Sequence, residues 1–277
     1  MTTSTIWTIL ALAALLVLIA AACDRRLIVR AYTIPSNKLH RPIRAVLLAD
    51  LHGFRFGRDQ ATLLRMIAGQ NPDIILMAGD MVDDRRRLEN SMFFLREVVK
   101  IAPAYYTPGN HEFRRQDWPD LAGMAESYGV VVLSDRVEEI RIGDNAFVLA
   151  GADDTAKRRW DRNYQGDAVM EQLFVPLTDQ PGYHILIGHR PDRIDQYKRY
   201  DFDLIVSGHA HGGQVRIPGL VNGLFAPQQG VFPPYTGGAY RHGNTVHVVS
   251  RGLAKPVFLP KVFIRPEVVV VKLVPEG

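Results

Sequence analysis

The chain contains a single cysteine, Cys23, among its 277 residues. One cysteine excludes an intramolecular disulfide and leaves no cysteine-based zinc site. The sequence also lacks an internal repeat, a low-complexity tract and a long basic tail. Its net charge of +4 favours contact with anions, but charges of both signs are interspersed, so nucleic acid is not expected as a partner.

Residues 6–22 also contain no charged side chain. As a helix, this apolar stretch would span about 25 Å, which is short but sufficient for a bilayer. Residues 1–5 carry no Lys or Arg, whereas a cleaved signal peptide needs a positive n-region. We therefore predict a transmembrane or signal-anchor segment at residues 1–24.

Arg25, Arg26 and Arg30 follow this segment. The positive-inside rule then favours a cytoplasmic catalytic domain, with the periplasmic face as the alternative. Cys23 follows three alanines, which invites a lipoprotein interpretation. Lipoprotein signals usually carry Leu where this chain has Ala20, so an unmodified cysteine at the membrane edge is favoured.

The whole chain has 47% apolar content, and the part after this segment is long enough to bury a large core in one domain. A segment rich in Arg, Pro and Asn predicts a linker at residues 25–43, followed by one domain at residues 44–277.

Short apolar runs without a 3.6-residue period predict strands buried on both faces. They lie at residues 45–49, 74–78, 104–107, 183–187 and 204–207. Amphipathic patterns predict helices between the first of them, at residues 59–68, 87–101 and 118–128. The second half reads as further strands at 130–133, 137–141, 146–150, 245–250 and 263–273, with helices at 167–174 and 193–200. The pattern predicts an α/β fold with a second sheet packed on the first and helices outside.

Five short motifs rich in histidine and carboxylates each follow one of these buried runs. They are Asp50-Leu51-His52, Gly79-Asp80, Gly109-Asn110-His111-Glu112, Gly188-His189 and Gly208-His209-Ala210-His211. The candidates thus lie at the C-terminal ends of strands, where open α/β sheets bind ligands. Five of the nine histidines fall in these motifs, which favours one shared metal site.

Residues two apart at a strand end project to the same side, as Asp50 with His52 and His209 with His211 would. Asp80 has two carboxylate oxygens and could bridge two ions, although Asp83 or Asp84 after it could instead cap a helix. The carbonyl oxygen of Asn110 can coordinate beside charged ligands. Mixed oxygen and nitrogen ligands suit Mn, Fe or Zn, with Mg as a further candidate.

The motifs resemble, in order and in residue types, those of the calcineurin-like metallophosphoesterase superfamily, which are D-x-H, G-D, G-N-H-[DE], G-H and G-H-x-H. Residues 208–218 and the N-terminal apolar segment are similar to the bacterial YaeI/YkuE-type phosphoesterases. This resemblance implies a four-layer αββα sandwich of two mixed sheets, a di-metal site at strand C-terminal ends and anchoring in a bacterial inner membrane.

The resemblance also implies a role for each motif residue. One divalent ion would be bound by Asp50, His52 and His211, the other by Asn110, His189 and His209, with Asp80 bridging them. His111 would not be a ligand but would hydrogen-bond the substrate phosphate or protonate the leaving oxygen. Two such ions can lower the pKa of a bridging water, which then attacks phosphorus as hydroxide.

The expected activity is therefore a metal-dependent phosphodiesterase or pyrophosphatase. A membrane lipid such as UDP-2,3-diacylglucosamine is one candidate substrate, and no protein partner is predicted. The alternatives are a phosphomonoesterase or phosphoprotein phosphatase, and a membrane-tethered metal-binding module without catalysis.

Residues 212–242 form a long Gly- and Pro-rich segment directly after the last motif. Long loops beside a site are usually functional. Its aromatic residues could form an apolar wall for a lipid tail or nucleoside, or a small satellite core. Arginines close to the motifs could contact phosphate or be solvated loop charges; they are Arg55, Arg114, Arg190, Arg216 and Arg251.

Overall fold

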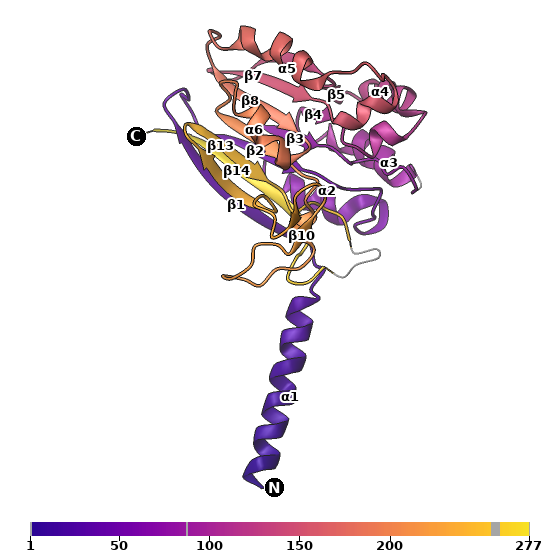
Figure 1. Cartoon of the computed structure of the whole chain (residues 1–277), viewed down its shortest axis with the longest axis vertical. Helices are drawn as coiled ribbons and strands as arrows, with labels where there is room; N and C mark the ends of the chain where they lie inside the picture. Colours follow the sequence, from indigo (N-terminus) through magenta and orange to yellow (C-terminus); the bar gives the residue numbers. More distant parts are fainter. Residues whose placement is uncertain (1, 87, 256–260, 277) are drawn as a thin grey trace.

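Two six-stranded sheets lie at the centre of the molecule, as a computed structural model of residues 2–86, 88–255 and 261–276 shows (Figure 1). The first sheet has the order β1 (Ile28–Ser36), β14 (Glu267–Pro275), β2 (Ile43–Leu48), β3 (Ile74–Ala78), β4 (Ala104–Thr107), β5 (Val131–Val132). The second has the order β12 (Gly238–His242), β13 (Thr245–Val249), β9 (Leu204–Ser207), β8 (Tyr183–Gly188), β7 (Asn145–Ala152), β6 (Arg136–Ile142). Each sheet contains parallel and antiparallel pairs.

Helices cover the outer face of each sheet. The first sheet packs against α2 (Ala61–Ala68), α3 (Glu89–Val98) and α4 (Trp118–Ser127), and the second against α5 (Gly166–Phe174) and α6 (Ile194–Tyr197). Short 3₁₀ turns adjoin them at η1 (Arg58–Gln60), η2 (Glu112–Arg114), η3 (Thr155–Arg159), η4 (Val175–Leu177), η5 (Pro191–Arg193) and η6 (His211–Gly213).

Strand β2 shows why the apolar runs in the sequence are not interrupted by polar residues. In β2, Val46 and Leu48 enter the core under the helices, whereas Ala45 and Leu47 enter the core between the two sheets. Both faces are buried, because successive side chains in a strand point to opposite sides. The four-layer αββα sandwich of two mixed sheets is thereby confirmed.

The linker prediction for residues 25–43 is wrong over β1. This strand pairs in parallel with β14 along its whole length, from Ile28 opposite Glu267 to Ser36 opposite Pro275. Its side chains alternate between exposed and half-buried, except for buried Ile34, and Pro35 is tolerated because β1 is an edge strand. Edge position and polar alternation made this strand resemble a linker.

Other helices and strands begin or end at residues that differ from the predicted ones. The helix predicted at 87–101 is α3, and its predicted first residue lies outside the described residues. The helix predicted at 193–200 is shorter, and the strand predicted at 263–273 is β14, which begins at Glu267. Residues 212–242 contain β12 and the small hairpin β10 (Phe225–Ala226) and β11 (Gly230–Val231), so this segment is not loop throughout.

The N-terminal apolar segment forms α1 (Thr3–Ala22), which projects from the domain as a stalk (Figure 1). Its mean hydropathy is 2.5 and none of it is buried. The helix is long and apolar enough to cross a membrane. It joins the domain at its end, where the Phe263 amide donates a hydrogen bond of 2.8 Å to the Ala22 carbonyl.

We predict that His247 makes the domain acid-sensitive. This side chain of β13 is fully buried beside Tyr235, Tyr240 and His242, and burial lowers its pKa from 6.5 to about 3. Because the unfolded state binds this proton at higher pH, stability is lost as pH falls from about 6.5 toward 3. At pH 5 the loss should approach about 2 kcal/mol.

Urea unfolding of metal-free protein at pH 7 and pH 5 tests this, with His247→Gln as the variant. Glutamine can keep a hydrogen bond to the Ser207 hydroxyl, which lies 3.0 Å from His247 Nε2. The variant should lose less stability between the two pH values than the parent. Equal losses would contradict the prediction, since all other titrating groups are common to both proteins.

Candidate metal centre

The motif residues gather where the two sheets meet. They follow β2, β3 and β4 of the first sheet and β8 and β9 of the second. The backbone amide of His209, after β9, donates to both carboxylate oxygens of Asp50, after β2, at 3.1 and 3.0 Å. One site is therefore assembled across the junction of the sheets.

The backbone at this junction adopts an unusual conformation. Five of the predicted ligands have positive φ, which is uncommon outside glycine: Asp50 (55°), His52 (47°), Asp80 (54°), His209 (64°) and His211 (49°). Such residues persist where surrounding contacts hold them, and they cluster at functional sites. Here the contacts include hydrogen bonds from Asp50 N to Gly79 O (3.0 Å) and from His52 N to Asp80 O (2.9 Å).

Two glycines permit the close approach of these segments. Gly79 has a φ of 79°, and a Cβ on it would lie 2.3 Å from Nδ1 of His189. A Cβ on Gly109 would lie 2.4 Å from Oδ1 of Asp80. Any larger residue would separate Asp80 from the groups around it.

Asp80 lies at the centre of the site. Its Oδ2 is 3.2 Å from Nε2 of His189, 3.6 Å from Nε2 of His52 and 3.9 Å from Nε2 of His111. Two groups have ligand atoms within 4.8 Å of one another, Asp50–His52–His211 and Asp80–His189–His209, and a third, His52–Asp80–His111, connects them. The structure thus brings the predicted residues into two adjoining sets that could each hold a metal ion.

Asn110 lies near the second set. Its side chain is buried, and its Oδ1 atom has no hydrogen-bond partner in the described part of the chain. It lines the same pocket as His209. An unsatisfied buried carbonyl oxygen is costly, and coordination to a cation would satisfy it.

Hydrogen bonds to the outer nitrogen of three histidines fix their orientation. Nδ1 of His52 contacts Asp83 at 3.0 Å, Nδ1 of His189 donates to the Ala78 carbonyl at 2.7 Å, and Nε2 of His209 contacts Oε1 of Gln228 at 2.5 Å. Such partners select the tautomer of a metal ligand. With these outer nitrogens occupied, His189 Nε2 and His209 Nδ1 face each other at 3.1 Å and are the nitrogens available to bind a cation.

The pKa shifts of His189 and His209 agree with this geometry. Burial disfavours a charged His189, yet Asp80 raises its pKa to about 10. Burial and the neighbouring His189 cation lower the pKa of His209 to about 4. In the described residues, every ion-pair partner of Asp50 and Asp80 within 4.0 Å is a histidine. The donor set therefore fits divalent cations, which would balance the two buried carboxylates.

His111 is held differently from the predicted ligands. Its Nδ1 lies 2.5 Å from Oδ1 of Asp84, and its Nε2 accepts a hydrogen bond of 3.1 Å from Arg114. The side chain is 22% exposed, more than that of His52 or His189. His111 thus lies beside Asp80 at the open side of the site.

Sequence reasoning missed the roles of two carboxylates near Asp80. Asp83 and Asp84 orient His52 and His111, and neither caps a helix, because α3 begins at Glu89 without a side-chain cap. Buried Glu112 accepts hydrogen bonds from the amides of Gly109, Asp80 and Val82 and from the Tyr106 hydroxyl. For Asp83 and Asp84, their position three and four residues after Asp80 was the only available signal.

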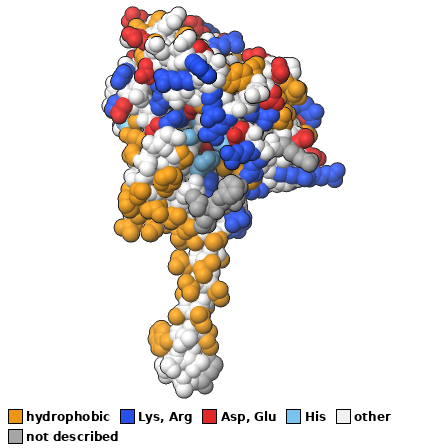
Figure 2. Space-filling view, turned by 45° about the vertical axis from the view of Figure 1, so that its right-hand side comes forward, with side chains coloured by type: hydrophobic (Ala, Val, Ile, Leu, Met, Phe, Trp, Pro, Cys, Tyr) orange, Lys and Arg blue, Asp and Glu red, His pale blue; other side chains and the backbone are white. Residues whose placement is uncertain are grey.

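Arginines surround the open side of the site. A pocket of about 360 Å³ contains Asn110 and His209 together with Arg114, Arg158, Arg159 and Arg190. Figure 2 shows Lys and Arg side chains gathered around histidine side chains near the middle of the face in view. This pocket could accommodate a group with several negative charges.

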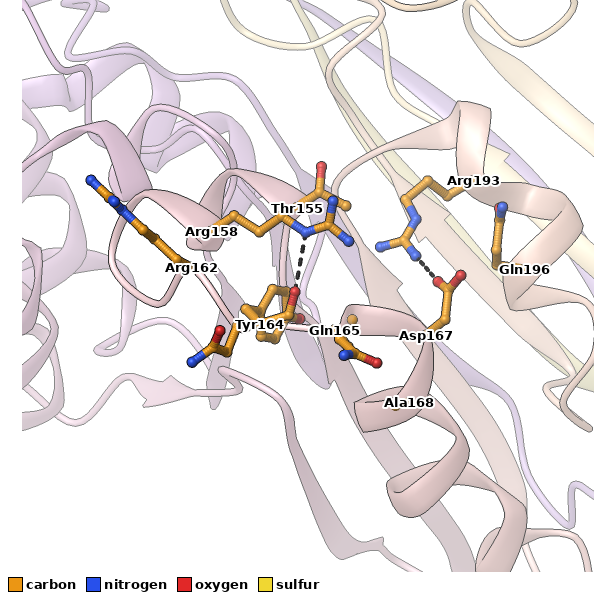
Figure 3. Close-up of a pocket in the computed structure, with 11 residues that line it drawn as sticks. Thr155, Arg158, Arg162, Tyr164, Gln165, Asp167, Ala168, Arg193 and Gln196 are labelled. Carbon is orange, nitrogen blue, oxygen red and sulfur yellow. Dashed lines mark hydrogen bonds and ion pairs between the residues drawn. The ribbon is translucent and has the colours of Figure 1, made fainter.

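A second pocket of about 660 Å³ shares Thr155 and Arg158 with the first (Figure 3). Arg162 and Arg193 also line it, and Arg193 forms an ion pair with Asp167. The Nε atom of Arg158 donates to the Tyr164 carbonyl at 3.1 Å. The two pockets together extend the positively charged surface away from the candidate metal centre.

Comparisons with known proteins agree with this site. The sequence model of the calcineurin-like phosphoesterase family matches residues 43–213. The chain is 28% identical to the uncharacterized metallophosphoesterase YkoQ of Bacillus subtilis, over 80% of each chain. It is also 28% identical to the phosphodiesterase YaeI of Escherichia coli, over 84% of this chain and 83% of that protein.

Two further comparisons concern the membrane segment and the fold. A transmembrane protein with metallophosphoesterase domain from Danio rerio is 30% identical, over 66% of this chain and 44% of its own length. The solved structure of the sulfate thiohydrolase SoxB of Thermus thermophilus matches with a TM-score of 0.54 at 14% identity. That match covers 88% of this chain but only 58% of SoxB, so it supports the fold alone.

We predict that Asp83→Asn weakens metal binding. Asn cannot accept the His52 proton as a carboxylate does, so His52 loses its fixed orientation. Loss of such a partner typically costs about 10- to 100-fold in metal affinity. Titration of the metal-free protein with Mn²⁺ or Zn²⁺ measures the change, with exposed Asp179→Asn as the matched control. Unchanged affinity in Asp83→Asn would show that Asp83 does not orient His52.

Proposed function

Because the chain belongs to the calcineurin-like phosphoesterase family, and is thus a hydrolase acting on phosphoesters, we propose that it is a phosphodiesterase or pyrophosphatase. The observation that carries the finer assignment is the arginine-lined pocket beside the candidate metal centre. A diester or pyrophosphate places a further charged or bulky group beyond the scissile phosphorus. A simple monoester would leave most of these cations without contact to the substrate.

The residue roles form part of this proposal. One ion would be held by Asp50, His52 and His211 and the other by Asn110, His189 and His209, with Asp80 between them. Manganese, iron and zinc suit this mixture of oxygen and nitrogen, and magnesium is a further candidate. When bound, two such cations activate water and neutralise charge that develops on the phosphoryl oxygens.

The protein side chains would orient the substrate phosphate and transfer a proton. Asp84 accepts the Nδ1 proton of His111, which leaves Nε2 facing Asp80 and the open pocket. From there His111 would contact a phosphoryl or leaving oxygen. Arg114, whose guanidinium adjoins His111 Nε2, would contact the same phosphate, since guanidinium donors match phosphate geometry.

The helix α1 supports a membrane location. We propose that residues 1–24 anchor the chain in a bacterial inner membrane and that β1 begins the catalytic domain. The arginines after α1 favour the cytoplasmic side by the positive-inside rule. An anchored enzyme would meet amphiphilic phosphoesters, of which UDP-2,3-diacylglucosamine is one example.

We expect His111→Ala to lose most turnover while it retains metal. The change removes a group that contacts the substrate but leaves the proposed ligands intact. The measurement is hydrolysis of bis-p-nitrophenyl phosphate and p-nitrophenyl phosphate by the full chain in detergent, with metal content determined in parallel. Loss of turnover by about 10²- to 10⁴-fold is typical for such a group.

Two further variants serve as controls for this experiment. Exposed His40→Ala should behave as the parent protein, and Asp80→Ala should lose both metal and activity. Loss of metal from His111→Ala would contradict its assignment as a group outside the ligand sets. Faster cleavage of the monoester than of the diester would favour the phosphomonoesterase, and metal binding without either activity would favour a binding module.

We also expect Arg159→Gln to impair substrates that carry a second phosphate. Arg159 is exposed and lines the pocket beside Asn110 and His209. Its loss should raise KM for a pyrophosphate such as UDP-glucose by about three- to ten-fold, with little effect on bis-p-nitrophenyl phosphate. Arg58→Gln, at an exposed arginine outside this pocket, is the control. Equal effects on both substrates would argue against a second anion site.

A further inference from the structure

Large apolar side chains are exposed on one short segment at the base of the domain. They are Ile217, Leu220, Leu224, Phe225, Val231 and Phe232, and the exposed fraction reaches 79% for Leu220 and 67% for Phe232. Figure 2 shows hydrophobic side chains gathered at this base, where the apolar stalk leaves the domain. We call residues 217–232 the apolar hairpin segment, because β10 and β11 form its centre.

Hydrogen bonds hold this segment in place. The Leu224 amide donates to Gly213 O at 2.9 Å, the Phe232 amide to Leu224 O at 2.9 Å, and the Thr236 hydroxyl to Asn222 O at 2.9 Å. Phe225 and Phe232 therefore stand out from a fixed backbone. The satellite core considered for these two aromatics from the sequence is not formed.

The segment adjoins the end of α1 through a short chain of contacts. Arg216 N donates to Val262 O at 3.0 Å, and Phe263 N donates to Ala22 O at 2.8 Å. In Figure 1, β10 likewise lies at the end of the domain from which α1 projects. The exposed apolar surface of the domain is thus continuous with the apolar surface of the helix.

Basic side chains flank this surface. Arg25 and Arg26 directly follow α1 and are exposed, and Arg265 donates to the Arg26 carbonyl at 2.9 Å. Arginine beside apolar residues is typical of surfaces at the boundary between acyl chains and anionic headgroups. Aromatic and aliphatic side chains exposed without a protein partner lose contact with water when they enter that boundary.

We propose that the apolar hairpin segment docks into the same bilayer that α1 spans, with Leu220, Val231 and Phe232 among the acyl chains. This proposal rests on the membrane anchor of the proposed function. The continuity with α1 selects the bilayer over a protein partner, because any other occupant would have to fit between the domain and the membrane. The domain then rests on the membrane surface and is not merely tethered near it.

Docking would also place the candidate metal centre at headgroup level. Gln228, in the turn between β10 and β11, contacts Nε2 of His209. The same hairpin thus bears the exposed apolar side chains and touches a predicted ligand. A phosphoester lipid could reach the site with its acyl chains still in the bilayer.

Fluorescent labelling of single cysteines in the full chain tests the docking. An environment-sensitive dye is attached to native Cys23, or, in a Cys23→Ser background, to Phe232→Cys, Leu220→Cys or Val175→Cys. Val175 is also apolar and 54% exposed but follows α5, at the end of the domain away from α1 (Figure 1). The proteins are reconstituted into vesicles of phosphatidylethanolamine and phosphatidylglycerol that contain lipids with a nitroxide on the acyl chain.

The expected result is quenching by the nitroxide and a blue-shifted emission at positions 232 and 220, as at position 23, but not at 175. Quenching at 23 alone would overturn docking while leaving the anchor. Quenching at none would overturn both. Dyes at 232 and 220 that are shielded from iodide but not quenched by the nitroxide would indicate a protein occupant and overturn the proposal. None of these readouts depends on hydrolysis, so they remain distinct from a failure of the proposed activity.

Discussion

The Asp80 carboxylate, almost fully buried among histidines, is the constraint on which the site depends. It follows β3 in a left-handed conformation, and its two oxygens face rings and amides that come from both sheets. A carboxylate in such surroundings is stable only beside a compensating positive charge. Histidines surround it, and their inward-facing nitrogens are placed to bind divalent cations that would supply this charge.

The groups around Asp80 are kept in place by a further layer of hydrogen bonds. Glu112 accepts hydrogen bonds from the amides of the loops that carry Asp80 and Asn110, so it connects these two loops. Asp83 and Gln228 set the orientation of His52 and His209. Since Gln228 belongs to the exposed hairpin, the same layer connects the metal centre to the surface beside α1.

Much of the fold and of the site could be predicted because it depends on local patterns. Continuous apolar runs such as residues 74–78 identify strands buried on both faces, and the motif after each run identifies candidate ligands. Edge strand β1 was missed because alternating half-buried residues carry little signal. Asp84 was missed because a carboxylate near a helix start is equally typical of a cap, and only the position of His111 reveals its partner.

The sequence by itself determined most of the elements, the order of the motifs and the chemistry of the candidate ligands, because each depends on residues close together in the chain. The tertiary structure alone decided which carboxylate orients which histidine, how the arginine-lined pockets adjoin the site, and that Phe225 and Phe232 remain exposed. These features depend on distances between segments far apart in the chain. His209 and Asp50, for example, are separated by 159 residues and meet only because the two sheets pack face to face, which brings the ends of β2 and β9 together.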